Sequence, residues 1–253
     1  MNPPGKNIYF AADAHLGNRY AADPPAAEKK LVRWLDSIRD HAGAVYFLGD
    51  LFDYWYEYKY VVPRGHIRFL GKLAELADRG VEIHLFIGNH DIWMFDYLPQ
   101  EIGVHIHQGP CTVDLLGKRF FLAHGDEVGR RSLAFRFLQA MFRNKVCQFL
   151  YAGIHPRWTF GLARRWSLSS RKTGMEKRPY TAADRQVAAL TDFAEAYARA
   201  HPDIHFFIFG HLHLLLDREL TPTSRLLFAG DWMQSFSYIR WDGDQLTLNR
   251  FEE

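Results

Sequence analysis

Short runs of consecutive apolar residues recur along the chain, and each has the length of a strand that is buried on both faces. The runs are Ile8–Ala12, Val45–Leu48, Ile83–Ile87, Phe120–Ala123 and Phe206–Phe209. Between the first three runs, apolar residues recur at spacings of three and four positions, which predicts helices over Ala26–Asp40 and His66–Arg79. Because strands and helices alternate, the pattern predicts right-handed crossovers and a largely parallel sheet.

The pattern changes after Phe209, where four short runs follow one another closely. These runs are Asp217–Leu220, Leu226–Ala229, Tyr238–Trp241 and Leu246–Asn249. Turn residues separate them, and Asp242-Gly243 is a favourable hairpin dipeptide, so antiparallel hairpins are predicted. Just before the Phe206–Phe209 run, the apolar positions of residues 181–200 predict one amphipathic helix with Thr181 as its N-cap.

The composition is typical of a globular protein with a large core. The 253 residues are 48% hydrophobic, 15% aromatic and 24% charged, which excludes a disordered chain. This length fits one domain, or one domain with an insertion. Cys111 and Cys147 are too few for a disulfide framework or a thiolate metal site, and this favours the reducing cytosol. No run reaches the ~18 apolar residues of a membrane span, so none is expected.

The formal net charge of +2 conceals two parts of opposite charge. Residues 128–180 carry twelve Lys or Arg and one acidic residue, a net charge of +11, whereas the rest of the chain carries −9. Nine aromatic residues are interleaved with these cations. One interpretation is a solvated helical hairpin whose aromatic residues pack on the main body. The favoured one is a segment that meets an anionic ligand or surface, because concentrated cations raise the local potential.

Five polar clusters each follow one of the predicted buried strands directly. They are Asp13-Ala14-His15, Gly49-Asp50-Leu51-Phe52-Asp53, Gly88-Asn89-His90-Asp91, His124-Gly125-Asp126 and Gly210-His211-Leu212-His213. A single cluster of this kind usually marks a capped loop. Five in succession at strand ends, where α/β folds place their ligand sites, indicate one functional site.

The donor types in these clusters suit a divalent metal. Carboxylates, imidazoles and one amide oxygen, without a thiolate, are typical ligands of Mn²⁺, Fe²⁺, Zn²⁺ or Mg²⁺. Asp13 and His15 lie two residues apart at a strand end, so both side chains can face one side and hold the same ion. His211 and His213 have the same spacing, but they need not share an ion if the chain turns between them.

The motifs D-x-H, G-D-x-x-D, G-N-H-D, H-G-D and G-H-x-H resemble those of the calcineurin-like metallophosphoesterase superfamily, over residues 13–213. The resemblance implies an α/β fold, an α/β/β/α sandwich of mixed sheets. It also implies two divalent metal ions, with Mn²⁺ expected and Fe²⁺ or Zn²⁺ as alternatives. The first ion is expected on Asp13, His15, Asp50 and His213, and the second on Asp50, Asn89, His124 and His211.

The same resemblance implies roles for the neighbouring residues. His90 is expected to be catalytic, by stabilising charge on the phosphate or by protonating the leaving group. Asp91 is expected to be the second catalytic residue, because it would orient the His90 ring. Asp53 and Asp126 are expected to support their loops in a similar way. For these three carboxylates, loop capping is the alternative interpretation.

The chain as a whole resembles the UDP-2,3-diacylglucosamine diphosphatase family of lipid A biosynthesis, in its length, its strand-end motifs and a helical lid after the H-G-D motif. The resemblance implies a core of residues 1–127 and 181–253 with a helical cap insertion over residues 128–180. It implies hydrolysis of the pyrophosphate bond to UMP and 2,3-diacylglucosamine 1-phosphate. The better-known branch has Arg where this chain has His90. Substrate-binding residues are expected at Asn89, His90, Arg164, Arg165, Ser170, Lys177 and His211.

A lipid-linked UDP-sugar substrate fits the cap, because a diphosphate attracts cations and two acyl chains need apolar surface beside an anionic inner membrane. The chain is therefore expected to be cytoplasmic and peripheral on the cytoplasmic face of that membrane, monomeric or dimeric, with no nucleic-acid partner. The enzymatic alternative is a phosphatase or pyrophosphatase for soluble nucleotides or phosphoproteins. A non-catalytic membrane-binding or nucleic-acid-binding module is the third hypothesis, which the complete set of metal donors disfavours.

Overall fold

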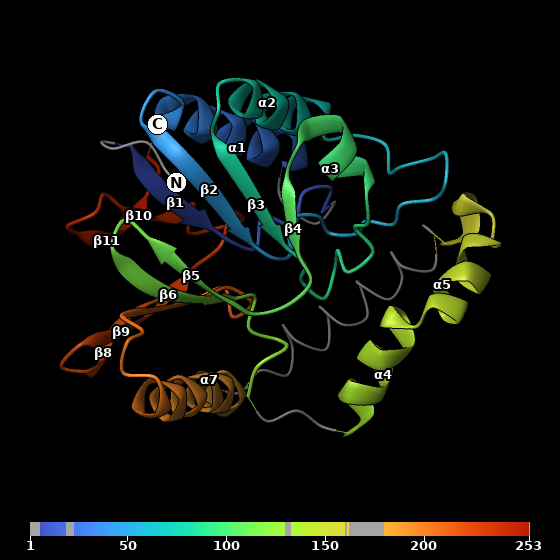
Figure 1. The fold of residues 1–253 in the computed structure, drawn as a ribbon. Coiled ribbons are helices and arrows are strands. Elements are labelled where there is room, and N and C mark those ends of the chain that lie inside the picture. Colours follow the sequence, from blue (N-terminus) through green and yellow to red (C-terminus); the bar gives the residue numbers. More distant parts are fainter. Residues whose placement is uncertain (1–5, 19–22, 130–132, 160, 162–179, 253) are drawn as a thin grey trace.

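The computed structural model describes residues 6–18, 23–129, 133–159, 161 and 180–252, and its strands form two sheets (Figure 1). The first sheet has the order β11-β10-β1-β2-β3-β4. Its strands are β1 (Asn7–Ala11), β2 (Ala42–Leu48), β3 (Glu82–Phe86), β4 (His105–His107), β10 (Ser237–Trp241) and β11 (Leu246–Arg250). Strands β1 to β4 pair in parallel, whereas β10 and β11 are antiparallel to their neighbours, so this sheet is mixed.

The second sheet has the order β5-β6-β7-β9-β8 and is also mixed. Its strands are β5 (Cys111–Leu115), β6 (Lys118–Ala123), β7 (Phe206–Phe209), β8 (Leu215–Thr221) and β9 (Ser224–Ala229). The three central strands pair in parallel, and the two edge strands pair antiparallel to them. Strands β8 and β9, and strands β10 and β11, form antiparallel pairs, which confirms the predicted hairpins.

Helices cover the outer faces of the two sheets (Figure 1). Helices α1 (Pro24–Ile38) and α2 (Ile67–Asp78) lie on the first sheet, and α7 (Tyr180–Ala200) lies on the second. Helix α1 begins where the side chain of Asp23 accepts a hydrogen bond from the backbone N–H of Ala26 at 3.0 Å. The layers therefore run helix, sheet, sheet, helix, which confirms the expected α/β/β/α sandwich.

Three apolar cores hold these layers together, and the alternation of side chains along the central strands assigns each residue to one of them. In β1, Tyr9 packs toward α1 and α2, whereas Ile8 and Phe10 pack between the two sheets. In β7, Phe207 packs toward α7 and Ile208 packs between the sheets. Because both faces of these strands are buried, their sequences are continuous apolar runs.

Two further helices stand beside the sandwich rather than in its layers (Figure 1). They are α4 (Leu133–Arg143) and α5 (Lys145–Ala152), and both lie in the cationic stretch of the sequence. Between them, the side chain of Asn144 caps α5 by accepting hydrogen bonds from the backbone N–H groups of Val146 and Cys147. Within the described residues, no helix combines the length and the apolar character that crossing a bilayer requires.

Some elements differ from the sequence-based expectations. Helix α3 (Tyr97–Ile102) and the strands β4 and β5 were not expected, because β4 has a single apolar residue between two histidines and β5 alternates like a half-exposed edge strand. The N-cap prediction for Thr181 is wrong, since Tyr180 already belongs to α7. The parallel pairing expected from the first strands is confirmed for β1 to β4, and the C-terminal hairpins add antiparallel strands to both sheets, which makes both of them mixed.

Candidate metal centre

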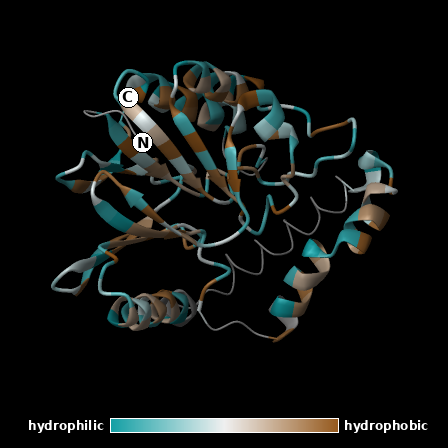
Figure 2. Ribbon diagram, viewed as in Figure 1, coloured by the Kyte–Doolittle hydropathy of each residue, from teal (hydrophilic) through white to brown (hydrophobic). Residues whose placement is uncertain are grey.

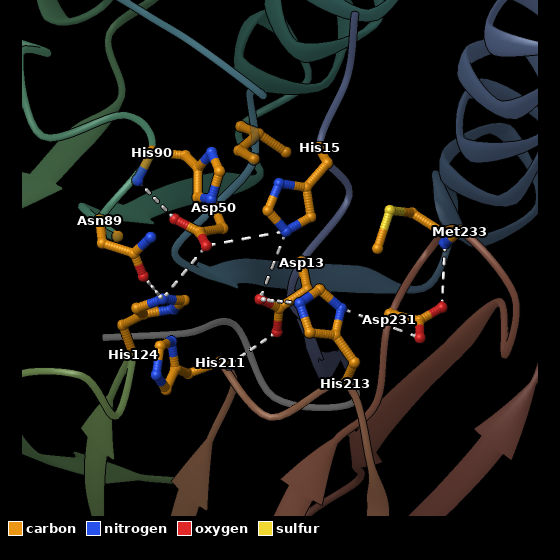
Figure 3. Close-up of polar contacts among 12 residues, drawn as sticks. Asp13, His15, Asp50, Asn89, His90, His124, His211, His213, Asp231 and Met233 are labelled. Carbon is orange, nitrogen blue, oxygen red and sulfur yellow. Dashed lines mark hydrogen bonds and ion pairs between the residues drawn. The ribbon is translucent and has the colours of Figure 1, made fainter. Parts of the chain in front are cut away.

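The seven predicted metal donors converge at one place, the carboxyl ends of strands from both sheets (Figure 3). The first sheet supplies Asp13 and His15 after β1, Asp50 after β2 and Asn89 after β3. The second sheet supplies His124 after β6 and both His211 and His213 after β7. Local motifs separated by up to two hundred positions are therefore brought together by the sheet topology, as the strand-end pattern predicted.

One group of donors consists of Asp13, His15 and His213, whose candidate ligand atoms all lie within 4.8 Å of one another. The Oδ1 atom of Asp13 lies 3.9 Å from Nε2 of His15 and 3.8 Å from Nε2 of His213. The two imidazole rings are stacked, with centroids 5.1 Å apart. This arrangement directs two imidazole nitrogens and one carboxylate oxygen toward a common point.

A second group consists of Asp50, His124 and His211. The Nε2 atom of His124 lies 3.5 Å from Oδ2 of Asp50 and 3.4 Å from the amide oxygen of Asn89. The Nδ1 atom of His124 lies 2.8 Å from the backbone carbonyl oxygen of Leu48, to which a protonated Nδ1 donates. That bond leaves the lone pair of Nε2 directed at the other donors, the orientation that a metal ligand needs.

Asp50 lies between the two groups. Its Oδ2 atom is 3.7 Å from Nε2 of His15 in the first group and 3.5 Å from Nε2 of His124 in the second. Its other oxygen, Oδ1, accepts a hydrogen bond from the backbone N–H of His90 at 2.9 Å. A carboxylate in this position can bridge two ions while its loop holds it in place.

The donors fit divalent metal ions. The Oδ1 atom of Asp13 is buried and accepts no hydrogen bond from the described residues, although it faces two imidazoles. The carboxylate–imidazole spacings, 3.5 to 3.9 Å, are longer than ordinary hydrogen bonds. Two ligands that share one ion at about 2.1 Å lie about 3 to 3.5 Å apart, close to the spacings seen here. Oxygen and imidazole donors are those that Mn²⁺, Fe²⁺ and Zn²⁺ accept.

The electrostatics of the site also favour bound cations. Burial raises the pKa of Asp13 well above its usual value, and His124 offsets only part of that effect. Burial acts on Asp50 in the same way, but the neighbouring imidazoles of His124 and His90 outweigh it and hold the pKa well below its usual range. Burial, reinforced by His124, lowers the pKa of His211 to about 3, so that its imidazole is neutral and able to bind a metal. Two buried carboxylates need compensating positive charge, which divalent ions supply.

The backbone at the donors is held in a conformation that side-chain-bearing residues rarely adopt. Asp13, His15, Asp50, His211 and His213 all have positive φ angles, between 42° and 69°. Such conformations cost of order 1–3 kcal/mol each and persist where the surrounding structure imposes them, most often at functional sites. The left-handed turns allow consecutive donors to point into one site immediately after a strand ends.

Two glycines allow the donor loops to approach closely. A Cβ atom on Gly88 would collide with Oδ1 of Asp50 and lie 2.5 Å from its backbone nitrogen. A Cβ atom on Gly49 would collide with the imidazole ring of His124, and Gly49 also has a φ of 89°. The glycine of each motif is therefore required by the packing of the neighbouring donor.

The structure corrects the expected role of Asp91. Its carboxylate is fully buried and accepts hydrogen bonds from the backbone N–H groups of Leu51, Phe52 and Gly88, at 2.7, 3.2 and 2.8 Å. It therefore ties the loop after β2 to the loop after β3, which is the loop-capping alternative. The ring of His90 is oriented by Asp53 instead, with Nδ1 lying 3.0 Å from the backbone oxygen and 3.9 Å from Oδ1 of that residue.

Two carboxylates at the site escaped the sequence analysis. The Oδ1 atom of Asp231 accepts backbone hydrogen bonds from residues 233–235, and its Oδ2 atom lies 3.9 Å from Nδ1 of His213 (Figure 3). The pair Gly230-Asp231 directly follows β9, so the strand-end signal was present. Glu127 accepts hydrogen bonds from the backbone N–H groups of His124 and Gly125, and burial together with Asp126 raises its pKa to about 7.

The remaining predicted positions have different outcomes. The side chain of Asp126 accepts a hydrogen bond from Gln139 of α4 at 2.6 Å, so it supports the start of the cationic stretch. Four predicted substrate-binding residues lie outside the described residues, namely Arg164, Arg165, Ser170 and Lys177.

Two mixed sheets between helices, with carboxylate and imidazole donors at the strand ends, define a metal-dependent hydrolase. The chain belongs to the calcineurin-like phosphoesterase family, whose sequence pattern matches residues 6–215. Members of this family use divalent metals, in agreement with the donor groups described above.

Curated relatives match nearly the whole chain. A UDP-2,3-diacylglucosamine hydrolase from Porphyromonas gingivalis is 49% identical over 256 residues, covering 97% of this chain and 98% of the relative. A protein of the same name from Aeromonas salmonicida is 27% identical, covering 91% of this chain and 87% of the relative. Among solved structures, the phosphoesterase Yfce from E. coli is 16% identical with a TM-score of 0.45, covering 96% of this chain and 92% of that protein.

Proposed function

We propose that this chain hydrolyses the pyrophosphate bond of UDP-2,3-diacylglucosamine, giving UMP and 2,3-diacylglucosamine 1-phosphate. The observation that carries the proposal is the convergence of all seven metal donors, in a chain that is 49% identical to a hydrolase named for this substrate. The near-complete coverage of both proteins extends the similarity beyond the donor motifs to the cationic stretch.

We assign one ion to Asp13, His15, Asp50 and His213, and a second to Asp50, Asn89, His124 and His211, with Mn²⁺ as the expected metal. When bound, the ions supply an activated water and positive charge for the phosphoryl oxygens, as in other two-metal hydrolases. The protein holds the donors in left-handed turns and directs Nε2 of His124 into the site through the carbonyl of Leu48.

His90 is the proposed catalytic side chain outside the donor set. Its ring lies beside that of His15, with centroids 4.7 Å apart at right angles, and Asp53 fixes the orientation of its Nδ1 atom. Nε2 is then the atom available to stabilise charge on a phosphate or to protonate the departing 2,3-diacylglucosamine 1-phosphate, because water is expected to attack the phosphorus on the UMP side. Asn89 and His211 lie at the same site and are the proposed substrate contacts among the described residues.

The substrate assignment is tested by comparing turnover of three compounds by the purified, Mn²⁺-loaded protein. We expect rapid release of UMP from UDP-2,3-diacylglucosamine, and turnover of ADP-ribose and of a phosphopeptide that is at least about a hundredfold slower, because acyl-chain contacts add binding energy that soluble compounds lack. Fast turnover of only the soluble compounds would establish the alternative, a phosphatase or pyrophosphatase for nucleotides or phosphoproteins.

Residues 128–180 are the proposed cap, inserted into a core formed by residues 1–127 and 181–253. Its described helices carry exposed apolar side chains, including Phe137 on α4 and Phe149 on α5, which are 73% and 78% exposed. Figure 2 shows that both helices contain hydrophobic and hydrophilic residues. Exposed cations accompany them, among them Arg136, Arg143 and Lys145. Apolar side chains beside cations match the surface of an anionic bilayer. We therefore place the protein in the cytoplasm, peripheral on the inner membrane that holds its substrate.

Membrane association is tested with the double variant Phe137→Glu/Phe149→Glu. Binding to vesicles of phosphatidylethanolamine and phosphatidylglycerol is expected to fall at least about tenfold, because two exposed aromatic side chains that would insert into the bilayer are replaced by charges that anionic lipid repels. Sedimentation with vesicles measures the effect. The matched control is Ile67→Glu, at an 81% exposed position on α2 of the core, which should bind as the parent does. Equal binding of the parent, the double variant and Ile67→Glu would show that the cap does not contact the membrane.

A further inference from the structure

The loops that carry the candidate site continue outward and contact the cap helices. After Asp53, the loop that follows β2 presents Tyr54, Tyr56 and Tyr58, and the loop that follows β3 presents Trp93. Their aromatic rings meet those of Phe142 and Tyr151 from the cap. We call these six residues the aromatic seam, namely Tyr54, Tyr56, Tyr58, Trp93, Phe142 and Tyr151.

The tyrosine hydroxyls of the core loop each bond to the segment that contains the cap helices. The hydroxyl of Tyr54 lies 3.0 Å from that of Tyr151, and the hydroxyl of Tyr56 donates to the backbone oxygen of Gln148 in α5 at 2.7 Å. The hydroxyl of Tyr58 bonds to Oγ1 of Thr159, which follows α5. Three bonds from alternate positions of one loop therefore connect it to Gln148, Tyr151 and Thr159.

Trp93 lies at the centre of the aromatic seam. Its ring stacks on Tyr151, with centroids 5.2 Å apart, and meets the edge of Phe142 at 5.1 Å. Its Nε1 atom donates to the backbone oxygen of Phe142 at 3.1 Å. Trp93 is only 9% exposed, so these contacts are shielded from water. Buried aromatic contacts with a satisfied polar atom have a defined geometry rather than a loose one.

Glu57 joins the two core loops beneath the aromatic seam. This carboxylate is 6% exposed, and its Oε1 atom accepts a hydrogen bond from Nε1 of Trp55 at 2.9 Å. Its Oε2 atom accepts from the backbone N–H groups of residues 95–97. The backbone N–H of Glu57 in turn donates to the backbone oxygen of Trp93 at 3.2 Å. The tyrosines and Trp93 therefore sit on one hydrogen-bonded unit.

The same unit is directly continuous with the candidate site. Tyr54 follows Asp53, which orients His90, and Trp93 lies two residues after Asp91, which ties the two loops together. These links are short and hydrogen-bonded, so a fixed position of α5 relative to the unit is also a fixed position relative to His90. The position of the cap is thereby fixed relative to the site at which the phosphate reacts.

We propose that the aromatic seam is a positioning device that holds the cap in register with the metal centre and so determines specificity for a large, lipid-linked substrate over a small phosphodiester. The inference rests on the proposed function, because a substrate that reaches from the metals to the cap is what makes the register matter. A small ester contacts only the donors and His90, and its turnover does not depend on where α5 lies.

The test is the triple variant Tyr54→Phe/Tyr56→Phe/Tyr58→Phe, which retains the rings and removes only the three hydroxyls that reach residues 148–159. We expect kcat/KM for UDP-2,3-diacylglucosamine to fall at least about tenfold, since each lost hydrogen bond loosens the cap. Turnover of bis(p-nitrophenyl) phosphate is expected to stay within about twofold of the parent. Hydrogen exchange of residues 133–159 should quicken, while that of the two sheets should not.

The control is Tyr9→Phe/Tyr238→Phe, which removes two tyrosine hydroxyls from the α1 side of the first sheet and is expected to change neither activity. An equal loss of both activities in the triple variant, or unchanged turnover of the lipid substrate, would overturn the inference. If the parent hydrolyses the small ester but not UDP-2,3-diacylglucosamine, the proposed function fails. Unaltered exchange of residues 133–159 in the triple variant would by itself reject the aromatic seam as the cap's anchor.

Discussion

Replacing Asp50 with alanine is expected to reduce hydrolysis of UDP-2,3-diacylglucosamine at least about a thousandfold. Its Oδ2 atom lies 3.7 Å from Nε2 of His15 and 3.5 Å from Nε2 of His124, so one side chain serves both donor groups. Its removal takes a ligand from each ion at once. Kinetic assay and metal analysis of the same preparation measure the effect, and the bound metal is expected to fall from two ions per chain to one or none.

A second carboxylate provides the control for this experiment. Asp217 pairs with Arg225 on the surface of the second sheet, and Asp217→Ala is expected to keep both activity and metal content. Asp50→Asn separates charge from size, because an amide of the same shape binds a divalent ion weakly and cannot bridge two. An Asp50→Ala protein that retained two ions and full turnover would reject the assigned site.

Removal of metal with a chelator is expected to abolish turnover and to lower the melting temperature. Asp13 and Asp50 are buried beside each other, and without cations the repulsion between them and their desolvation are uncompensated. A ligand present at about a hundred times its Kd stabilises a fold by about 2.7 kcal/mol, which corresponds to roughly 5–10 °C for a domain of this size. Calorimetry with and without Mn²⁺ measures the shift.

The Asp50→Ala variant tests whether the rise in melting temperature comes from metal bound at the assigned site. Because it lacks a ligand for both ions, its melting temperature is expected to rise by much less than that of the parent when Mn²⁺ is added. Restored activity after addition of Mn²⁺ to the chelated parent excludes irreversible damage by the chelator. A parent protein whose melting temperature and activity both survived complete metal removal would contradict the metal-dependent assignment.

The donor clusters could be predicted from the sequence because each is local. A short apolar run is followed at once by Asp13, Asp50 or His124, and the end of a buried strand is where an α/β sandwich brings such residues together. The buried strands were predictable for the same reason, since strands buried on both faces are continuous apolar runs, whereas the order of the layers was implied only by the family resemblance. The edge strands β4 and β5 were missed because half-exposed edges lack that signal.

The partners of the buried carboxylates could not be predicted, because they lie far away in the sequence. Asp91 accepts hydrogen bonds from Leu51 and Phe52, about forty positions earlier, and Glu57 accepts them from residues 95–97. The sequence shows only that a carboxylate is present in a loop. Which backbone groups it satisfies depends on the packing of two loops, so neither the role of Asp91 nor the existence of the aromatic seam follows from local spacing.

The division of each donor group between the two sheets has a consequence for how the protein is made. Asp13 and His15 leave the ribosome long before His211, which follows Asp13 by 198 positions, and His213 comes later still. A partly synthesised chain that has formed only strands β1 to β4 presents carboxylates without most of their imidazole partners. Neither ion can then acquire its full set of ligands until the second sheet has docked. Metal capture thus marks the completion of folding, and chains that stall earlier remain without the ions that would stabilise them.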